Sequence, residues 1–210
     1  VLRESVSLSL AVMASVPLAL VSGLTLTLLN GQFLEELVAT FNQALARLEQ
    51  DLQQEGSGQL AFNSLAVPQV AALLATGNAV IALLSLMLGR YWQAALYNPG
   101  GFGGEFRALR LPTGAVVAMA LAAGALWWMG PGWRVWSAAA VLPLTIAGFA
   151  LVHAYAARAN KGVAWLTLMY VLWIVLDPVK WVWVGCVVVD AFADFRARWA
   201  NPTGKGSGGA

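Results

Sequence analysis

Long apolar stretches alternate with short charged ones along this chain. Five stretches are nearly free of charge, at residues 5–29, 67–89, 113–129, 136–156 and 163–189. The last of them carries only Asp177 and Lys180. A run of roughly 18 or more apolar residues is long enough to cross the hydrocarbon core of a bilayer as a helix. The pattern therefore predicts an all-α fold, a polytopic transmembrane helical bundle.

We expect six spans in one domain over residues 1–200, followed by a flexible tail at 201–210. The predicted spans are about 6–29, 68–89, 113–129, 136–156, 163–176 and 178–194. The last two are short and are separated by Leu176-Asp177-Pro178, where an Asp N-cap and a proline at the first helical position favour a tight hairpin. One long kinked helix over 163–194 is the alternative, because proline can kink a membrane helix without ending it.

The basic residues predict the orientation of the bundle. With the N-terminus in the cytoplasm, the twelve Lys and Arg residues divide nine to three in favour of the cytoplasmic side. This division follows the positive-inside rule. Only Arg47, Arg134 and Lys180 then lie outside, and both ends of the chain lie inside.

Residues 32–54, between the first two spans, show a helical period instead of a continuous apolar run. Their apolar residues recur at three- and four-residue steps and form one stripe about 100° wide. Acidic residues outnumber basic ones, which argues against strong binding to anionic lipids. We expect an extracytoplasmic amphipathic helix that packs over the ends of the spans or against another subunit. The predicted partner contacts on this stripe are Leu34, Leu37, Phe41, Leu45 and Leu48.

A glycine-rich segment at 90–112 is the predicted cytoplasmic elbow between the second and third spans. Its Asn-Pro-Gly-Gly sequence is a strong turn signal. The glycines lack the Lys-Ser/Thr of a phosphate-binding P-loop, so a nucleotide site is not expected. We predict an interfacial elbow or a docking loop for another protein. Its candidate contact residues are Asn98, Gly100, Gly101, Phe102, Phe106, Arg107 and Arg110.

Four ionisable residues near the cytoplasmic end form a candidate polar cluster: His153, Arg158, Asp190 and Asp194. The two aspartates are four apart and share a helix face, which Arg198 continues one turn later. We interpret them as a solvated helix end paired with Arg, so Asp190→Asn should change little. The alternative is an ion or proton site inside the bundle, with Asp190 paired to His153 or Arg158.

Composition limits the classes of function that this chain can have. Hydrophobic residues make up 60% of the chain and charged residues 10%, whereas soluble domains carry about 25% charged residues. One Cys and one His leave little for a metal site, so no metal or cofactor is expected. The chain has no HExxH, Gly-x-Ser-x-Gly or Walker A sequence, which argues against an enzyme. A net charge of +2 does not suggest a nucleic-acid partner.

Two motifs carry a resemblance to a known family. The elbow sequence RYWQAALYNPGGFGGEFRALRLP and the later VDAFADFRARW resemble the YybS-like family of bacterial multi-pass membrane proteins of unknown function. Members typically have further spans before the point where this chain starts. The family is distantly similar to the substrate-binding subunits of energy-coupling-factor transporters. The resemblance implies a protein of the bacterial cytoplasmic membrane.

Two functional hypotheses follow. The first is a non-enzymatic scaffold or accessory subunit that works through other membrane proteins or as a homo-oligomer. The second is a transport subunit that binds a small solute between its helices. A cavity at membrane depth, open to the outside and lined by polar groups, would favour the second hypothesis.

Overall fold

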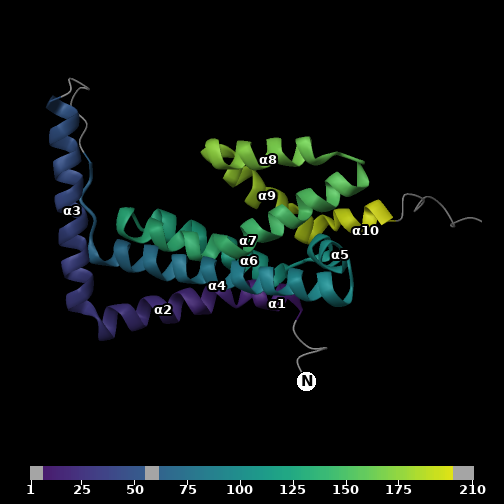
Figure 1. The fold of residues 1–210 in the computed structure, drawn as a ribbon, viewed down its shortest axis with the longest axis horizontal. Helices are drawn as coiled ribbons and strands as arrows, with labels where there is room; N and C mark the ends of the chain where they lie inside the picture. Colours follow the sequence, from purple (N-terminus) through teal and green to yellow (C-terminus); the bar gives the residue numbers. More distant parts are fainter. Residues whose placement is uncertain (1–6, 55–61, 201–210) are drawn as a thin grey trace, which may run out of the picture.

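The computed structural model describes residues 7–54 and 62–200, and these residues form an all-α bundle (Figure 1). The predicted tail at 201–210 lies outside the described residues. The helices are α1 Leu8–Met13, α2 Ser15–Leu29, α3 Gly31–Gln54, α4 Val67–Tyr97, α5 Gly101–Ala108, α6 Thr113–Trp128, α7 Pro131–Arg158, α8 Val163–Val175, α9 Asp177–Ala193 and α10 Phe195–Ala200.

Three helical segments are long and apolar enough to cross a membrane by themselves. They are Leu8–Leu29, which contains α1 and α2, then α4 and α7. The pairs α5–α6 and α8–α9 pass the same test only together, and they are bent by 68° and 114°. The chain is thus a membrane protein whose described residues provide three to five candidate spans, and the predicted count of six is not confirmed.

Helix α7 lies at the centre of the bundle and packs against α4, α6 and α9. Leu144 and Ala150 of α7 are fully buried in the main apolar cluster, together with Val12 of α1. Helix α4 presents Ala75 and Ala79, both fully buried, toward its neighbours. Small residues four apart let membrane helices approach closely, and α2 is the helix that packs most extensively against α4.

Two helix contacts are tighter still, because each places a tryptophan ring on a glycine. The ring of Trp136 in α7 covers Gly23 of α2, and the ring of Trp183 in α9 covers Gly148 of α7. In both places an added Cβ atom would overlap the indole ring. The absence of a side chain at Gly23 and Gly148 therefore sets how closely these helices approach.

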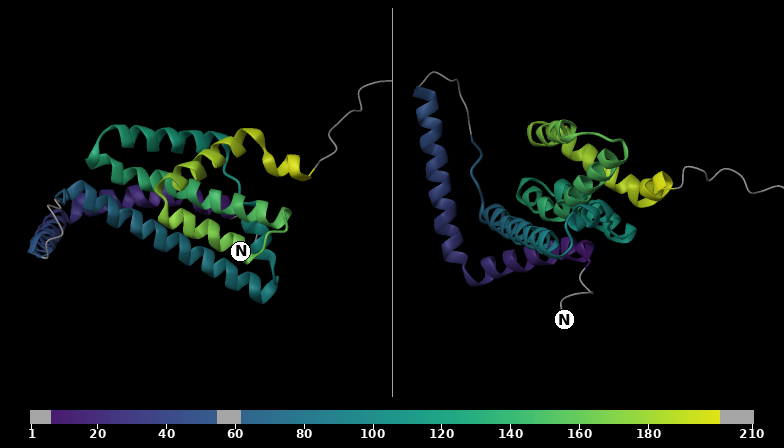
Figure 2. Two further views of the ribbon diagram at one scale, coloured as in Figure 1. Left: turned by 90° about the horizontal axis from the view of Figure 1, so that it is seen from above. Right: turned by 45° about the vertical axis from the view of Figure 1, so that its right-hand side comes forward.

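The predicted amphipathic helix at 32–54 is present as α3, Gly31–Gln54. It stands across the ends of α2 and α4, away from α5 (Figures 1 and 2). After the residues that are not described, the chain returns along α3. There the Asn42 side chain donates a hydrogen bond to the Leu65 carbonyl (3.0 Å) and accepts one from the Leu65 N–H (2.8 Å). These two bonds fix the returning segment against the helix.

The second span and the elbow differ from their predicted bounds. Helix α4 continues through Tyr97 rather than ending near residue 89, and residues 101–108 form α5. The α4 backbone hydrogen bonds continue after the apolar run ends, because a helix needs no apolar environment to propagate. Gly100 joins α4 to α5 in the left-handed region, with φ of +84°, which glycine adopts without strain.

The sharp bend between α8 and α9 occurs at the predicted Leu176-Asp177-Pro178 turn. Leu176 rather than Asp177 occupies the N-cap position, and Asp177 instead lies in the first turn of α9, paired with Lys180 at 2.6 Å. With 13 residues, α8 is about 20 Å long, shorter than a hydrocarbon core of about 30 Å. The turn lies short of the bundle end at which α6 leads into α7 (Figures 1 and 2).

Candidate functional site

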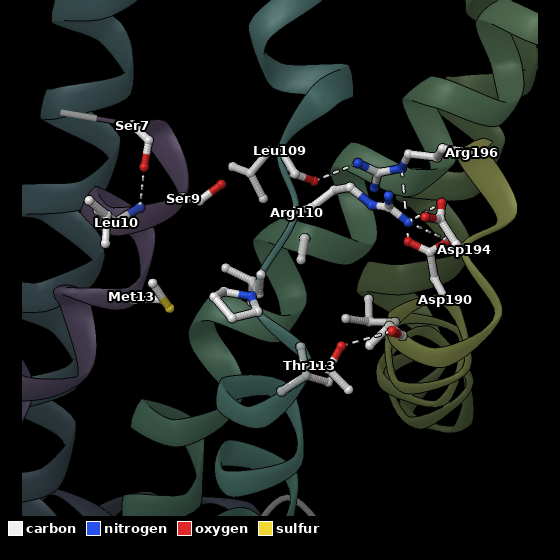
Figure 3. A pocket seen from close by; sticks show the side chains of 16 residues that line it. Ser7, Ser9, Leu10, Met13, Leu109, Arg110, Thr113, Asp190, Asp194 and Arg196 are labelled. Atoms are coloured by element: carbon white, nitrogen blue, oxygen red, sulfur yellow. Dashed lines mark hydrogen bonds and ion pairs between the residues drawn. The ribbon is translucent and has the colours of Figure 1, made fainter. Parts of the chain in front are cut away.

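Four charged side chains meet at the end of the bundle where α9 stops (Figure 3). We call Arg110, Asp190, Asp194 and Arg196 the Arg–Asp cluster. Arg110 Nη2 lies 2.5 Å from Asp194 Oδ1 and 3.9 Å from Asp190 Oδ1. Arg196 Nε lies 3.9 Å from Asp190 Oδ2. The cluster joins the extended segment between α5 and α6 to the end of α9 and to α10.

The way α9 ends builds this cluster. Asp194 is the C-cap and adopts the left-handed conformation, with φ of +48°, which aspartate tolerates better than most side chains. The chain then turns into α10, and the Phe195 N–H donates a hydrogen bond to Asp190 Oδ1 at 3.0 Å. The same turn brings Arg196 back to donate to the Leu109 carbonyl at 2.6 Å. The helix break therefore brings Arg196 to Asp190, whereas Arg110 reaches the two aspartates from the segment between α5 and α6.

Asp190 is buried, with 7% of its surface exposed. The prediction of a solvated helix end at Asp190 is therefore wrong. Its pairing with arginine is present, but the partners are Arg110 and Arg196. Buried carboxylates are tolerated when charged partners and N–H donors surround them, as they do here. The burial also removes the basis for expecting Asp190→Asn to change little.

Among the described residues, the Arg–Asp cluster contains two positively charged and two negatively charged side chains. The hydrogen bond from Arg110 to Asp194 raises the pKa of Arg110 above its usual value, and the charge of Asp190 acts in the same direction. Burial lowers the pKa of Arg196, and Asp190 counters part of that shift. Among the described residues, two guanidinium groups face two carboxylates in one ion-pair network. Such a network links the chain segments that supply its side chains.

A cavity of about 380 Å³ lies beside the cluster. Ser9 and Met13 line it from α1, opposite Arg110 and Asp190 (Figure 3). One edge of the cavity is held by Thr113, whose hydroxyl donates to the Ala191 carbonyl at 2.9 Å. The hollow has a polar and an apolar part, and the cluster closes it on one side.

The other two members of the predicted polar cluster lie elsewhere. His153 Nε2 shares a hydrogen bond with the Tyr170 hydroxyl at 2.7 Å, and its ring meets the edge of Phe106. Arg158 donates to the Trp199 carbonyl and lies over the Trp199 ring. The structure therefore brings Asp190 and Asp194 together but places neither His153 nor Arg158 with them. Across residues 7–54 and 62–200, no three His, Cys, Asp or Glu side chains form a possible metal site.

Some of the predicted contact residues of the elbow pack against the protein core, and others are exposed. Phe102 and Phe106 turn inward against the core, and Phe102 meets Tyr91 edge to face at 6.0 Å. Arg110 belongs to the Arg–Asp cluster, whereas Arg107 remains exposed. At the turn itself, Asn98, Gly100 and Gly101 lie at or near the surface.

The apolar stripe of the predicted amphipathic helix is buried in its first part and more exposed further along. Leu34 is fully buried against Val70 and Ala71 of α4, and Leu37 packs on the same cluster. Further along α3, Phe41 and Leu48 are exposed and Leu45 is half-buried. Packing over the span ends is thus present, but only in the first half of the helix.

A second cavity, of about 300 Å³, lies beside the α8–α9 bend. It is lined by Asp177, Lys180 and Trp181 of α9 and by Trp127 of α6. The two tryptophan rings meet edge to face at 5.2 Å. The sequence indicated Asp177 only as part of a turn and Lys180 only as a basic residue on the outer side, since nothing in the local pattern shows that α6 ends beside them.

These elements define a class: an all-α integral membrane protein with an ion-pair network at one end of its bundle. No protein-family model, curated protein or solved structure matches the chain.

Proposed function

We propose that this chain is a non-enzymatic accessory or scaffold subunit of a larger complex in the bacterial cytoplasmic membrane. The observation that carries the proposal is the projecting end of α4. With 31 residues, α4 is about 46 Å long, whereas a span needs only about 20 residues. Its last two turns therefore extend beyond the hydrocarbon core and present their side chains at or outside the membrane surface.

This projecting end is apolar and aromatic. Leu96 is 77% exposed and Tyr97 is 82% exposed, and Trp92 is exposed one turn earlier. A cavity of about 280 Å³ adjoins them, lined by Arg90, Glu105 and other polar residues. Aromatic residues and arginine are enriched in protein interfaces, and a few of them carry most of the binding energy. The end of α4 therefore has the composition of a contact surface for another protein.

The surface is also preorganised. Arg90 pairs with Glu105 of α5 at 2.7 Å, and the Gly101 N–H donates to the Asn98 carbonyl at 2.9 Å. The edge-to-face contact between Phe102 of α5 and Tyr91 of α4 holds the elbow against α4. A surface that is already ordered loses less conformational entropy on binding, so α5 supports the end of α4 as a docking element.

Purification from the native membrane in mild detergent tests the proposal. We expect a stoichiometric partner, either another membrane protein or a second copy of this chain. Tyr97→Asp should weaken the association about thirtyfold, the effect of losing about 2 kcal/mol at an interface hot spot. Gln43→Asp adds the same charge on the exposed face of α3 and should leave the association unchanged. A monodisperse monomer, or equal binding by both variants, contradicts the proposal.

The cavity beside the α8–α9 bend favours a second candidate, a small-solute-binding transport subunit. It combines aromatic walls with an ion pair, Asp177–Lys180, on the side of the bundle predicted to face outward. Ligand sites are commonly apolar hollows with a few convergent polar groups. A purified monomer that retains a small molecule would favour this candidate over the first.

A further inference from the structure

Helix α3 is oriented unlike every helix that could cross the membrane. It lies transverse to α2 and α4, at their shared end (Figures 1 and 2). Both of those helices belong to candidate membrane spans. If α2 and α4 run across the bilayer, α3 runs along its surface.

The contacts of α3 show which side of it faces the bundle. Leu34 is 0% exposed and packs on Val70 and Ala71, near the start of α4. Val38 and Leu37 pack on the same cluster. The apolar stripe of α3 therefore faces the span ends, the direction in which the hydrocarbon core lies.

The stripe continues beyond the part of α3 that contacts α4. Phe41 and Leu48 are each 47% exposed, although they lie within about 40° of Leu34 around the helix. Asn42 holds the returning segment on one flank of the stripe and leaves these two residues uncovered. At the other end of α3, Leu28 and Leu29 are the last two residues of α2, and both are exposed. Exposed apolar side chains therefore flank the buried start of the stripe on both sides.

We propose that the second half of α3 lies in the boundary between lipid headgroups and acyl chains, with Phe41 and Leu48 inserted on the same side of the bilayer as the ends of α2 and α4. Amphipathic helices bind this boundary by burying their apolar face. Helix α3 carries four acidic residues and one basic residue. Its lipid surface is therefore a neutral or zwitterionic one, and apolar burial rather than charge attraction holds it there.

Spin labels on α3 test this arrangement in the full chain, in nanodiscs of phosphatidylcholine. Phe41→Cys and Leu48→Cys report the stripe, and Gln43→Cys and Gln50→Cys report the opposite face, all in a Cys186→Ser background. We expect the stripe labels to collide more with oxygen, which concentrates in lipid, than with a water-soluble nickel chelate. The labels at Gln43 and Gln50 should show the reverse order.

Each other outcome overturns the proposal. If the nickel chelate collides with the stripe labels as often as with the label at Gln43, the stripe of α3 lies in water. Stripe labels shielded from both reagents would show that protein covers the stripe. In nanodiscs made of equal parts phosphatidylcholine and phosphatidylglycerol, the stripe should insert no more deeply. Deeper insertion there would contradict binding by apolar burial alone.

Discussion

Replacing Asp190 with alanine should lower the free energy of unfolding by about 3 kcal/mol or more, because it leaves Arg196 buried without its carboxylate partner. The Phe195 N–H, which donates to Asp190 Oδ1, loses its acceptor as well. Asp190→Asn keeps an amide oxygen for that N–H and should cost about 1–3 kcal/mol. Titration with a denaturing detergent in mixed micelles measures both values.

The control for Asp190 is another aspartate in the same helix. Asp177 pairs with Lys180 at 2.6 Å, but its side chain is 87% exposed. Exposed ion pairs contribute about 0–1 kcal/mol, so Asp177→Ala should change stability little. Equal effects from Asp190→Ala and Asp177→Ala would show that the Arg–Asp cluster does not hold α9 and α10 to the rest of the bundle.

Gly148→Ala should destabilise the bundle by about 1–3 kcal/mol, since the new methyl group overlaps the Trp183 ring that covers this glycine. Trp183 is buried and its Nε1 has no hydrogen-bond partner among the described residues, so packing alone holds the ring in place. The Phe149 ring packs against another side of the Trp183 ring, with the two ring centroids 5.4 Å apart. This contact limits how far the Trp183 ring can move. The apparent melting temperature in mild detergent, followed by tryptophan fluorescence, measures the loss.

A second glycine provides the contrast. Gly77 lies within α4 and has open space where a Cβ would be placed. Gly77→Ala should leave stability unchanged or raise it by about 0.5–1 kcal/mol, because alanine loses less backbone entropy in a helix. Adding Trp183→Leu to Gly148→Ala should recover part of the loss by making room for the methyl group. Indistinguishable Gly148→Ala and Gly77→Ala variants would contradict the close contact between α7 and α9.

Periodicity and hydropathy predicted the helical content well. The stripe at 32–54 predicted α3 almost to the residue, because an amphipathic helix carries its orientation in its own pattern. The end of α4 was missed for a physical reason. Hydropathy marks where the chain leaves the lipid, near Arg90, whereas the helix continues to Tyr97.

The Arg–Asp cluster was only half predictable. Asp190 and Asp194 share a face by their four-residue spacing, and the sequence showed this directly. Arg110 lies 84 positions from Asp194, and no local pattern indicates that the two would meet. The burial of Asp190 depends on the left-handed turn at Asp194, which is a feature of tertiary structure. His153 was considered as a partner of Asp190 only in the alternative interpretation, and its actual neighbour, Tyr170, lies on α8, whose tilt the sequence does not specify.

The bent α8–α9 pair shows another limit of hydropathy. Each helix is apolar enough to belong in a membrane, but an apolar run does not reveal how deeply it enters. With a bend of 114° between them, the two helices form a broken span or a re-entrant loop, and the pair counts as at most one candidate span. The described residues therefore provide three to five candidate spans, and the predicted six are not confirmed.

The central prediction is that this bundle crosses a membrane with α3 outside and α5 in the cytoplasm. Single cysteines at Gln50→Cys in α3 and Gly104→Cys in α5, both in the Cys186→Ser background, test it with a thiol reagent that does not cross membranes. Both positions are exposed, and a Cβ at Gly104 meets open space. We expect right-side-out vesicles to label only the Gln50 position and inside-out vesicles only the Gly104 position. Labelling of both positions from the same side would contradict this prediction.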